Sequence, residues 1–373
     1  MEEKGGIRLN QKYFDRLLKE LNRTDYDAVM VTPSNEFKFL VGHTPSLGAR
    51  FEGLFILKDG RYFHICPLLS QEEMGEIFGA ERVHAWSDGD GYLDTVAQCA
   101  DRYGLRGKTV AVNQHTRAFH VLEIADAGIM DFASGKILME EMRIIKDSEE
   151  MQYLRIASRY ADEVFTELVD FIQPGMIEKD VKDKIRACFK AKGVTGDGMV
   201  AVGPNASMPH YNRSDRVIQE QDLVLLDFGC TYHGLYSDIT RTVFVGNPTA
   251  EQIKVYEIVK RANEKAIQAI AVGVKASAID QVARDIIAAE GYGDYFLSRL
   301  GHGIGYAGHE APDIKGSNHR KLETGMAFSI EPGIYLPGNF GVRIEDIILM
   351  GPEGVEVLNQ VTKEMIVIET KRN

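Results

Sequence analysis

Two aspartates that lie eleven residues apart carry the clearest chemical signal in this sequence. Asp227 ends an apolar run, and Asp238 opens a second β-like run. A carboxylate at the end of a buried strand is costly unless it is paired or bound to a cation. A hairpin that turns at Tyr232 and His233 would place the two aspartates directly opposite each other on one face. Because two bare carboxylates so close together would repel, the pattern predicts that they share a divalent metal ion.

Two glutamates show the same arrangement further along the chain. Glu331 ends an apolar run just before a Pro-Gly pair, and Glu345 lies in the later run 342–349. Their midpoint is Gly338, which belongs to a strong turn signal, so these carboxylates can also face each other across a hairpin. His302 lies between the two hairpins, within the glycine-rich stretch GHGIG. Four carboxylates and one imidazole form an oxygen-rich set that suits a pair of divalent ions such as manganese, cobalt or zinc.

Five stretches resemble, in order and spacing, the motifs of the pita-bread metallopeptidases: LLDFG, YSDITRT, GHGIGYAGHE, SIEPGIY and GVRIED. The resemblance is greatest to the proline-specific branch, prolidase (Xaa-Pro dipeptidase) and aminopeptidase P. It covers about residue 143 to the C-terminus, and the N-terminal part resembles the creatinase/prolidase N-terminal domain more weakly. The resemblance implies two divalent metal ions, with Mn²⁺ or Co²⁺ favoured and Zn²⁺ as an alternative, held by Asp227, Asp238, His302, Glu331 and Glu345.

The same resemblance implies an exopeptidase that hydrolyses the bond between an N-terminal residue and a following proline. A water molecule bridging two metal ions loses its proton near neutral pH and becomes the nucleophile, and Glu331 is expected to be both a ligand and the proton shuttle. His309 is expected to contact the substrate and stabilise the tetrahedral intermediate. His210, in a loop rich in turn-forming residues, is expected to reach the substrate from the other side. Arg343 and Thr240 are expected to hold the carboxylate ligands in place.

One position departs from the pattern of the family. Prolidases often carry an arginine four residues after the second histidine of the stretch that here reads GHGIGYAGHE. Such an arginine can pair with the C-terminal carboxylate of a dipeptide. The corresponding residue here is Asp313, which cannot make that contact, so peptides longer than a dipeptide are favoured as substrates.

Two domains are expected to position these residues. Residues 1–142 alternate between β-like runs and helical patterns, which predicts a small α/β domain. Residues 143–373 are expected to form an α+β catalytic domain with the pita-bread fold. Two predicted helix pairs, 147–171 with 178–191 and 249–272 with 278–289, each precede a carboxylate hairpin. This repetition predicts two pseudo-twofold halves that face each other around one central site.

The composition bears on partners and location. A net charge of -12 argues against non-specific nucleic-acid binding. No stretch approaches the ~20 apolar residues of a membrane span, and the charged start MEEKGGIRLN does not resemble a secretory signal. Four scattered cysteines indicate neither a thiol zinc site nor a disulfide framework. We therefore expect a cytoplasmic enzyme whose partners are small peptides with proline in the second position, and the resemblance implies a homodimer.

Three alternatives compete with the proline-specific peptidase. A methionine aminopeptidase, or an aminopeptidase of broader specificity, explains the metal set equally well. The N-terminal domain and the loop GPNASMPH favour the proline-specific branch. A creatinase would not keep the ligand set. A non-catalytic binding protein on this fold would be expected to lose ligands, and this chain retains all five.

Overall fold

Two units make up the chain, and they divide between Arg143 and Ile144. The computed structural model describes residues 9–42 and 48–369. Within these ranges no helix combines the length and the apolar character needed to cross a membrane.

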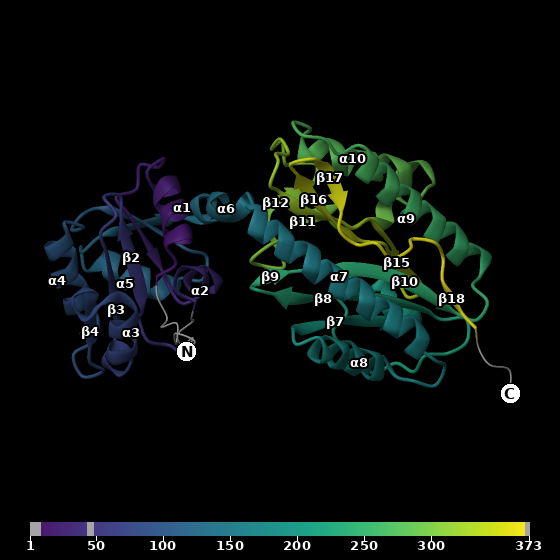
Figure 1. Ribbon diagram of the computed structural model, residues 1–373, viewed down its shortest axis with the longest axis horizontal. Helices are drawn as coiled ribbons and strands as arrows, with labels where there is room; N and C mark the ends of the chain where they lie inside the picture. The colour runs from purple at the N-terminus through teal and green to yellow at the C-terminus, as the bar shows by residue number, and fades with distance from the viewer. Residues whose placement is uncertain (1–8, 43–47, 370–373) are drawn as a thin grey trace, which may run out of the picture. The chain divides into compact units, whose positions relative to one another are not determined.

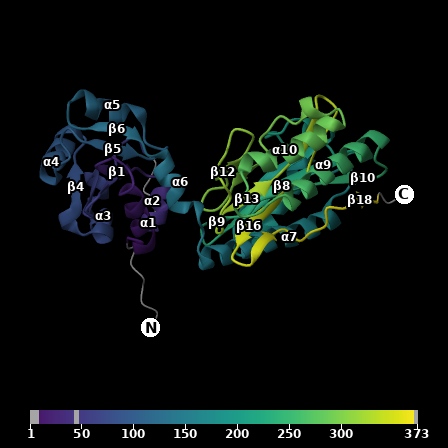
Figure 2. The same cartoon turned by 90° about the horizontal axis from the view of Figure 1, so that it is seen from above.

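The first unit is a six-stranded sheet with helices on both faces, in the order β4-β3-β2-β1-β5-β6. Apolar side chains of α1, α2, α3 and α6 pack on one face of this sheet, and those of α4 and α5 pack on the other. In Figure 2, α5 lies on the opposite side of the strands from α1 and α3. The predicted α/β class of this unit is therefore confirmed. The strands are β1 (Ala28–Val31), β2 (Gly53–Leu57), β3 (Tyr62–Pro67), β4 (Val83–Trp86), β5 (Thr109–Val112) and β6 (Asp131–Ser134). The helices are α1 (Gln11–Leu21), α2 (Asn35–Val41), α3 (Gln71–Phe78), α4 (Leu93–Tyr103), α5 (Ala118–Asp126) and α6 (Lys136–Ile144).

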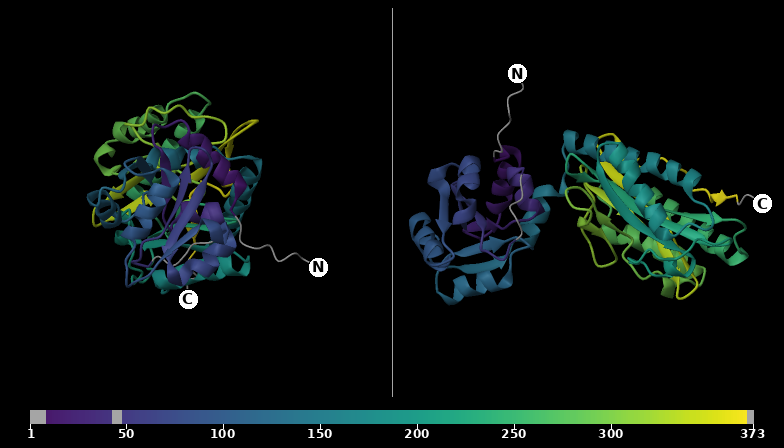
Figure 3. Two further views of the ribbon diagram at one scale, coloured as in Figure 1. Left: turned by 90° about the vertical axis from the view of Figure 1, so that its left-hand side faces the viewer. Right: turned by 90° about the horizontal axis from the view of Figure 1, so that it is seen from below.

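The second unit contains two larger sheets and a separate two-stranded ribbon. In the first sheet the strand order is β18-β10-β8-β7, with β9 paired to β8, and in the second it is β12-β11-β13-β16-β17. Figure 1 and Figure 3 show α7 and α8 along the first sheet and α9 and α10 over the second. The first-sheet strands are β7 (Thr195–Val202), β8 (Leu223–Tyr232), β9 (Leu235–Tyr236), β10 (Ile239–Val245) and β18 (Val367–Ile368). The others are β11 (Gly301–Gly303), β12 (Glu310–Ile314), β13 (Ala327–Ile330), β14 (Gly333–Leu336), β15 (Phe340–Arg343), β16 (Asp346–Gly351) and β17 (Gly354–Val357).

The helices of the second unit largely follow the sequence signals. A capping box at Asp147 starts α7 (Ser148–Phe171), and α8 (Glu178–Ala191) has the predicted bounds. A second capping box at Thr249 starts α9 (Ala250–Gln268), which ends four residues before the expected end at residue 272. The helix α10 (Ala276–Ala289) starts two residues earlier than expected.

The strand β8 is buried on both faces, and this decides the direction of Asp227. Leu223 and Leu225 pack into the core beneath α9 and α10, whereas Val224 and Leu226 pack into the core beneath α7 and α8. Because side chains alternate along a strand, Asp227 continues the face that looks towards α9 and the second sheet.

The expected register of the first hairpin was wrong. Its turn lies at His233 and Gly234, which both have positive φ angles of 47° and 83°, as a two-residue hairpin turn requires. The turn is therefore one residue later than expected, and Asp227 lies opposite Thr240 instead of Asp238. Since alternate residues share a face, Asp227 and Asp238 remain diagonal neighbours on the same side of the sheet.

The second hairpin has the register that the sequence predicted. Ile330 pairs with Asp346, and Gly333 pairs with Arg343. Glu331 and the residue opposite it, Glu345, lie in the gap between these two ladders.

Gly229→Ala is expected to lower the free energy of unfolding by about 1–3 kcal/mol, in the range of an overpacked core. A Cβ atom at this position would overlap with the carbonyl oxygen of Ser237 in the hairpin that carries both aspartates. Urea unfolding measures the effect, and Gly316→Ala is the control because its Cβ would meet its nearest neighbour at 3.5 Å, an ordinary contact. Equal losses of stability in the two variants would contradict this account of the hairpin.

Candidate metal centre

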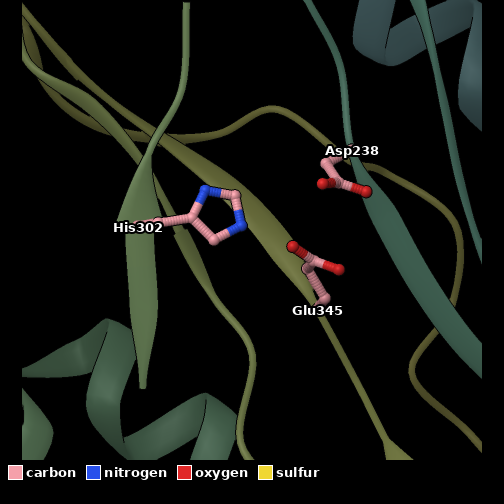
Figure 4. A group of neighbouring side chains, drawn as sticks. All are labelled: Asp238, His302 and Glu345. Atoms are coloured by element: carbon pink, nitrogen blue, oxygen red, sulfur yellow. The ribbon is translucent and has the colours of Figure 1, made fainter. Parts of the chain in front are cut away.

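Three of the predicted ligands form a tight group. Ligand atoms of Asp238, His302 and Glu345 all lie within 4.8 Å of one another. Figure 4 shows the three side chains pointing towards one another from different strands. Asp238 immediately precedes β10, His302 lies on β11, and Glu345 immediately precedes β16. The group is therefore built from both sheets of the second unit.

The other two predicted ligands border this group. Glu331 Oε1 lies 3.3 Å from His302 Nε2, and the Ser329 hydroxyl donates a hydrogen bond of 3.3 Å to the same oxygen. Asp227 is near enough for its charge to raise the pKa values of Asp238 and Glu331. The structure thus brings together in one place the five residues that the sequence analysis selected.

Burial and mutual repulsion disfavour the charged forms of the carboxylates in the site. Burial raises the pKa of Asp238 well above its usual value, and the charges of Asp227 and Glu331 raise it further. Burial and the neighbouring acids act in the same direction on the pKa of Glu345. The pKa of Glu331 is raised to about 7, chiefly by burial, although Arg343 opposes the shift. Such a group favours either bound protons or a bound cation.

His302 presents a free electron pair to the site. Its Nδ1 lies 3.1 Å from the carbonyl oxygen of Gly303, and since a carbonyl can only accept, Nδ1 carries the hydrogen. Burial, followed by the nearby His309, lowers the pKa of His302 to about 3, so the ring is neutral. Its Nε2 is therefore available as an acceptor or as a metal ligand.

Arg343 and Thr240 connect the carboxylates to one another. The Arg343 guanidinium forms an ion pair with Asp227 and donates from Nε to Thr240 Oγ1 at 3.1 Å. Thr240 in turn donates its hydroxyl hydrogen to Glu345 Oε2 at 2.7 Å. The backbone N–H of Glu345 also donates to the Thr240 carbonyl at 3.0 Å, so Thr240 joins the two halves at the centre of the site.

His309 lies beside the metal-ligand group. Its ring centroid is 4.0 Å from that of His302, and partial burial followed by the charge of Arg299 lowers its pKa. The loop that carries it is fixed by Glu310, which accepts from Lys146 Nζ at 2.5 Å and from the backbone N–H of Ala307 at 3.2 Å. Both side chains of the Lys146–Glu310 ion pair are fully buried.

His210 lies in an exposed turn whose neighbours are firmly held. The buried Glu178 accepts hydrogen bonds of 2.9 Å from Asn205 and 2.7 Å from the Tyr211 hydroxyl. The charge of His210 contributes to lowering the pKa of His309. The two histidines that are predicted to contact the substrate are therefore close enough to interact electrostatically.

A cleft of about 420 Å³ opens beside Asp227 and Asp238. Its walls include Gly198 and Met199 of β7, together with Tyr236. This volume falls within the range of ~300–1,000 Å³ that is typical of small-ligand sites, so a short peptide can lie next to the carboxylates.

Asp313 does not present an uncompensated negative charge. Its carboxylate oxygens lie 3.2 Å from Arg299 Nη1 and 2.6 Å from Lys315 Nζ. The expectation that Asp313 disfavours dipeptide substrates left out these two cations. Arg299 also acts on the pKa of His302 and of His309, which places a positive charge near the histidine pair.

Several buried polar residues lie behind the site and were not predicted from the sequence. Arg241 is 1% exposed and donates from Nη1 to the carbonyl of Glu345 at 2.6 Å and from Nη2 to Asp346 Oδ1 at 2.7 Å. The signal that could have revealed it is a charged residue in the middle of the otherwise apolar and threonine-containing strand β10. Lys146, Glu178 and Glu310 give no comparable signal, because their partners are distant in sequence.

Comparisons with known proteins agree with this geometry. The model of metallopeptidase family M24 matches residues 152–352. An uncharacterized peptidase of Staphylococcus aureus is 36% identical over 353 residues, which cover 93% of this chain and 99% of that protein. A prolidase from Thermococcus sibiricus is 33% identical, with a TM-score of 0.88 over 96% of this chain and 98% of that chain. An Xaa-Pro dipeptidase from Bacillus anthracis is 32% identical, with a TM-score of 0.82 over 96% and 99%.

These likenesses cover both units of the chain, and they confirm the expected fold and the resemblance to the proline-specific branch. An X-Pro aminopeptidase from Thermotoga maritima is also similar, at 28% identity and a TM-score of 0.80 over 95% of this chain and 99% of that chain. The match to the family model and the full-length relatives together show that this chain belongs to metallopeptidase family M24, the enzymes with the pita-bread fold.

Proposed function

We propose that this protein is a dinuclear metal-dependent exopeptidase that hydrolyses the bond between an N-terminal residue and a following proline. The observation that carries the proposal is the convergence of four carboxylates and one neutral imidazole, two of which, Asp227 and Asp238, line a cleft of about 420 Å³. The similarity to a prolidase and to an Xaa-Pro dipeptidase supports the specificity for proline. The proposed ligands are Asp227, Asp238, His302, Glu331 and Glu345, and the proposed ions are Mn²⁺ or Co²⁺, with Zn²⁺ as an alternative.

The residues fit such ions on two grounds. Glu345 Oε1 is buried and has no hydrogen-bond partner, although a buried carboxylate oxygen without a partner is unfavourable. Burial and the neighbouring carboxylates raise the pKa values of Asp238 and Glu345 despite the charge of Arg343, so further positive charge would be favourable there. Cations among these oxygens would give Glu345 Oε1 a partner and would stabilise the charged carboxylates. Oxygen donors with one imidazole suit Mn²⁺, Co²⁺ and Zn²⁺.

The protein groups around the site have distinct proposed roles. When bound, the metal ions would activate a water molecule and polarise the scissile carbonyl. Glu331 holds a proton on its carboxylate during the reaction and passes it to the leaving nitrogen, and Ser329 fixes the orientation of that carboxylate. His309 donates a hydrogen bond to the charge that develops on the substrate, and His210 contacts the substrate from the opposite loop.

Arg299 is the proposed partner of the substrate's C-terminal carboxylate. It lies three residues before His302 in the sequence, and its side chain is 33% exposed while it pairs with Asp313. Asp313 holds the guanidinium, and a guanidinium can accommodate a second carboxylate through its other N–H groups. A cation at this position makes dipeptides acceptable substrates, contrary to the expectation drawn from Asp313.

A homodimeric state and a cytoplasmic location complete the proposal. The dimer rests on the resemblance to the family. The location is supported by Cys66, Cys99, Cys188 and Cys230, which are all buried and free of disulfides, as is usual in a reducing compartment.

The proposed activity can be tested with a matched panel of peptides. The wild-type protein with Mn²⁺ should hydrolyse an Xaa-Pro dipeptide much faster than the matching Xaa-Ala dipeptide, and a chelator should abolish the reaction. Glu331→Gln should lower kcat by about 10²-fold or more, because the amide cannot hold the proton. Preference for Xaa-Ala, or full activity in verified metal-free protein, would overturn the proposal.

Metal binding should stabilise the protein more at about pH 8 than at about pH 5. In the metal-free fold the pKa of Glu331 is raised from 4.5 to about 7, and those of Asp238 and Glu345 are also raised. The folded chain therefore binds more protons than the unfolded chain in this window, so these groups reduce stability as the pH rises. Urea unfolding with Mn²⁺ or with chelator measures the difference, and an equal gain from Mn²⁺ at both pH values would contradict the assignment.

Removal of the Arg299 side chain should lower kcat/KM more for substrates that have a free C-terminal carboxylate than for substrates that lack one. Arg299→Ala should lower kcat/KM for an Xaa-Pro dipeptide by about tenfold or more, the effect of losing a charge-assisted pair. The same variant should hydrolyse the corresponding Xaa-Pro amide at nearly the wild-type rate. Lys315→Ala is the control, because it removes the other cation on Asp313. A larger effect in the Lys315 variant, or equal losses for the two substrates, would show that the assignment to Arg299 is wrong.

A further inference from the structure

The backbone changes its hydrogen-bonding partners at the two glutamates. The β13–β16 ladder ends at Ile330 and Asp346, and the β14–β15 ladder starts at Gly333. Between these ladders, the Glu331 N–H donates to the Leu300 carbonyl at 2.7 Å, and the Glu345 N–H donates to the Thr240 carbonyl at 3.0 Å. Each glutamate N–H is thus bonded outward, to the residue before β11 in one case and to β10 in the other, and not to the partner across the hairpin.

The next residue pair, Pro332 and Ile344, can form only half of its ladder bonds. The Ile344 N–H donates to the Pro332 carbonyl at 3.5 Å. Proline has no N–H, so it cannot return a bond to the Ile344 carbonyl. That buried carbonyl needs another donor. The site therefore contains a weak point in the pairing immediately beside both glutamates.

Asn263 of α9 supplies the missing donor. Its amide Nδ2 donates to the Ile344 carbonyl at 3.2 Å and to the Ile330 carbonyl at 2.9 Å. These carbonyls belong to the residues directly before Glu345 and Glu331. One fully buried side chain therefore ties together the two backbone segments that carry the glutamates.

The orientation of the Asn263 amide is fixed by charge. Its Oδ1 accepts from Lys363 Nζ at 2.8 Å, and an ammonium group can only donate, so Nδ2 must face the two carbonyls. Lys363 is itself held by Asp346 at 2.6 Å, and Asp346 also pairs with Arg241 at 2.7 Å. The amide is thus one end of a connected network in which only Lys363 is partly exposed, and such a network is rigid when its members are satisfied.

We propose that Asn263 is a positioning residue that sets the separation of the Glu331 and Glu345 carboxylates and thereby the affinity for the metal ions. The inference rests on the proposed dinuclear site. Without the amide, the two carbonyls are left without this donor in a buried place, and the segments relax apart. The loss of a group that orients metal ligands typically weakens metal affinity by about 10–100-fold.

Asn359 provides a matched control. It is also buried, with 3% of its surface exposed. Its Oδ1 accepts from the Ile347 N–H at 2.8 Å, and its Nδ2 donates to Asp162 at 3.3 Å. It therefore anchors β16, the strand that follows Glu345, without bonding to the residues that precede the two glutamates. Asn→Ala at the two positions removes the same atoms from the same kind of environment.

The test is calorimetric titration of the metal-free protein with Mn²⁺ alone, together with thermal unfolding of each variant. Asn263→Ala should raise the Kd for Mn²⁺ by about tenfold or more, whereas Asn359→Ala should lower Tm and leave the Kd within about twofold of wild type. An unchanged Kd in Asn263→Ala, or equal increases in both variants, would overturn the inference. A wild-type protein that binds no Mn²⁺ would instead overturn the proposed function.

A second variant keeps the test decisive if Asn263→Ala does not fold. Asn263→Asp preserves the size of the side chain and its acceptor for Lys363, but it places an oxygen where Nδ2 faces the two carbonyls. A Kd raised by about tenfold or more in this variant supports the inference, and a wild-type Kd overturns it.

Discussion

The central constraint on this structure is the crowding of four carboxylates where water is largely excluded. One permanent cation, Arg343, lies among them, and although its burial opposes ionisation, Tyr335 and Asp227 raise its pKa further. Arg343 and the neighbouring Arg299 cannot balance four acids, so the fold must hold the remaining charges together against their repulsion. It does so by taking Asp227 from within β8 and the other three carboxylates from residues that directly precede or follow strands, where hydrogen bonds to neighbouring strands fix the backbone.

The buried residues behind the site also help to hold the carboxylates in place. Asp346 is fully buried and lies between Arg241 and Lys363, so its charge is balanced by two cations. Breaking a buried ion pair by removing one partner is strongly destabilising, because the other charge stays buried. Arg241 also donates to the carbonyls of Val361 and Thr362. A late segment of the chain thereby becomes part of the support for Glu345, although it contributes no ligand.

Helix starts and hairpin turns depend on neighbouring residues, and most of these features could be predicted from the sequence. The N-terminal capping signal of Asp147 and Glu150 predicted the start of α7, and the turn around Gly338 predicted the Glu331–Glu345 register. The first hairpin was misjudged by one residue, because Gly234 carries the second positive φ angle of the turn. Short elements such as α2, α3 and β4 gave no clear periodicity and were not predicted. Contacts such as that between Asn263 and the two carbonyls depend on α9 crossing behind the hairpin, which no local pattern encodes.

The alternating burial of β8 limits how this chain can change over evolution. Leu223 and Leu225 belong to one core, and Val224 and Leu226 belong to the other. Substitutions among apolar residues can be absorbed on either side. The insertion or deletion of a single residue before Asp227 would exchange the two faces and turn the carboxylate away from the second sheet. We therefore expect relatives to vary freely in the identity of these residues, but to keep the length of the strand constant.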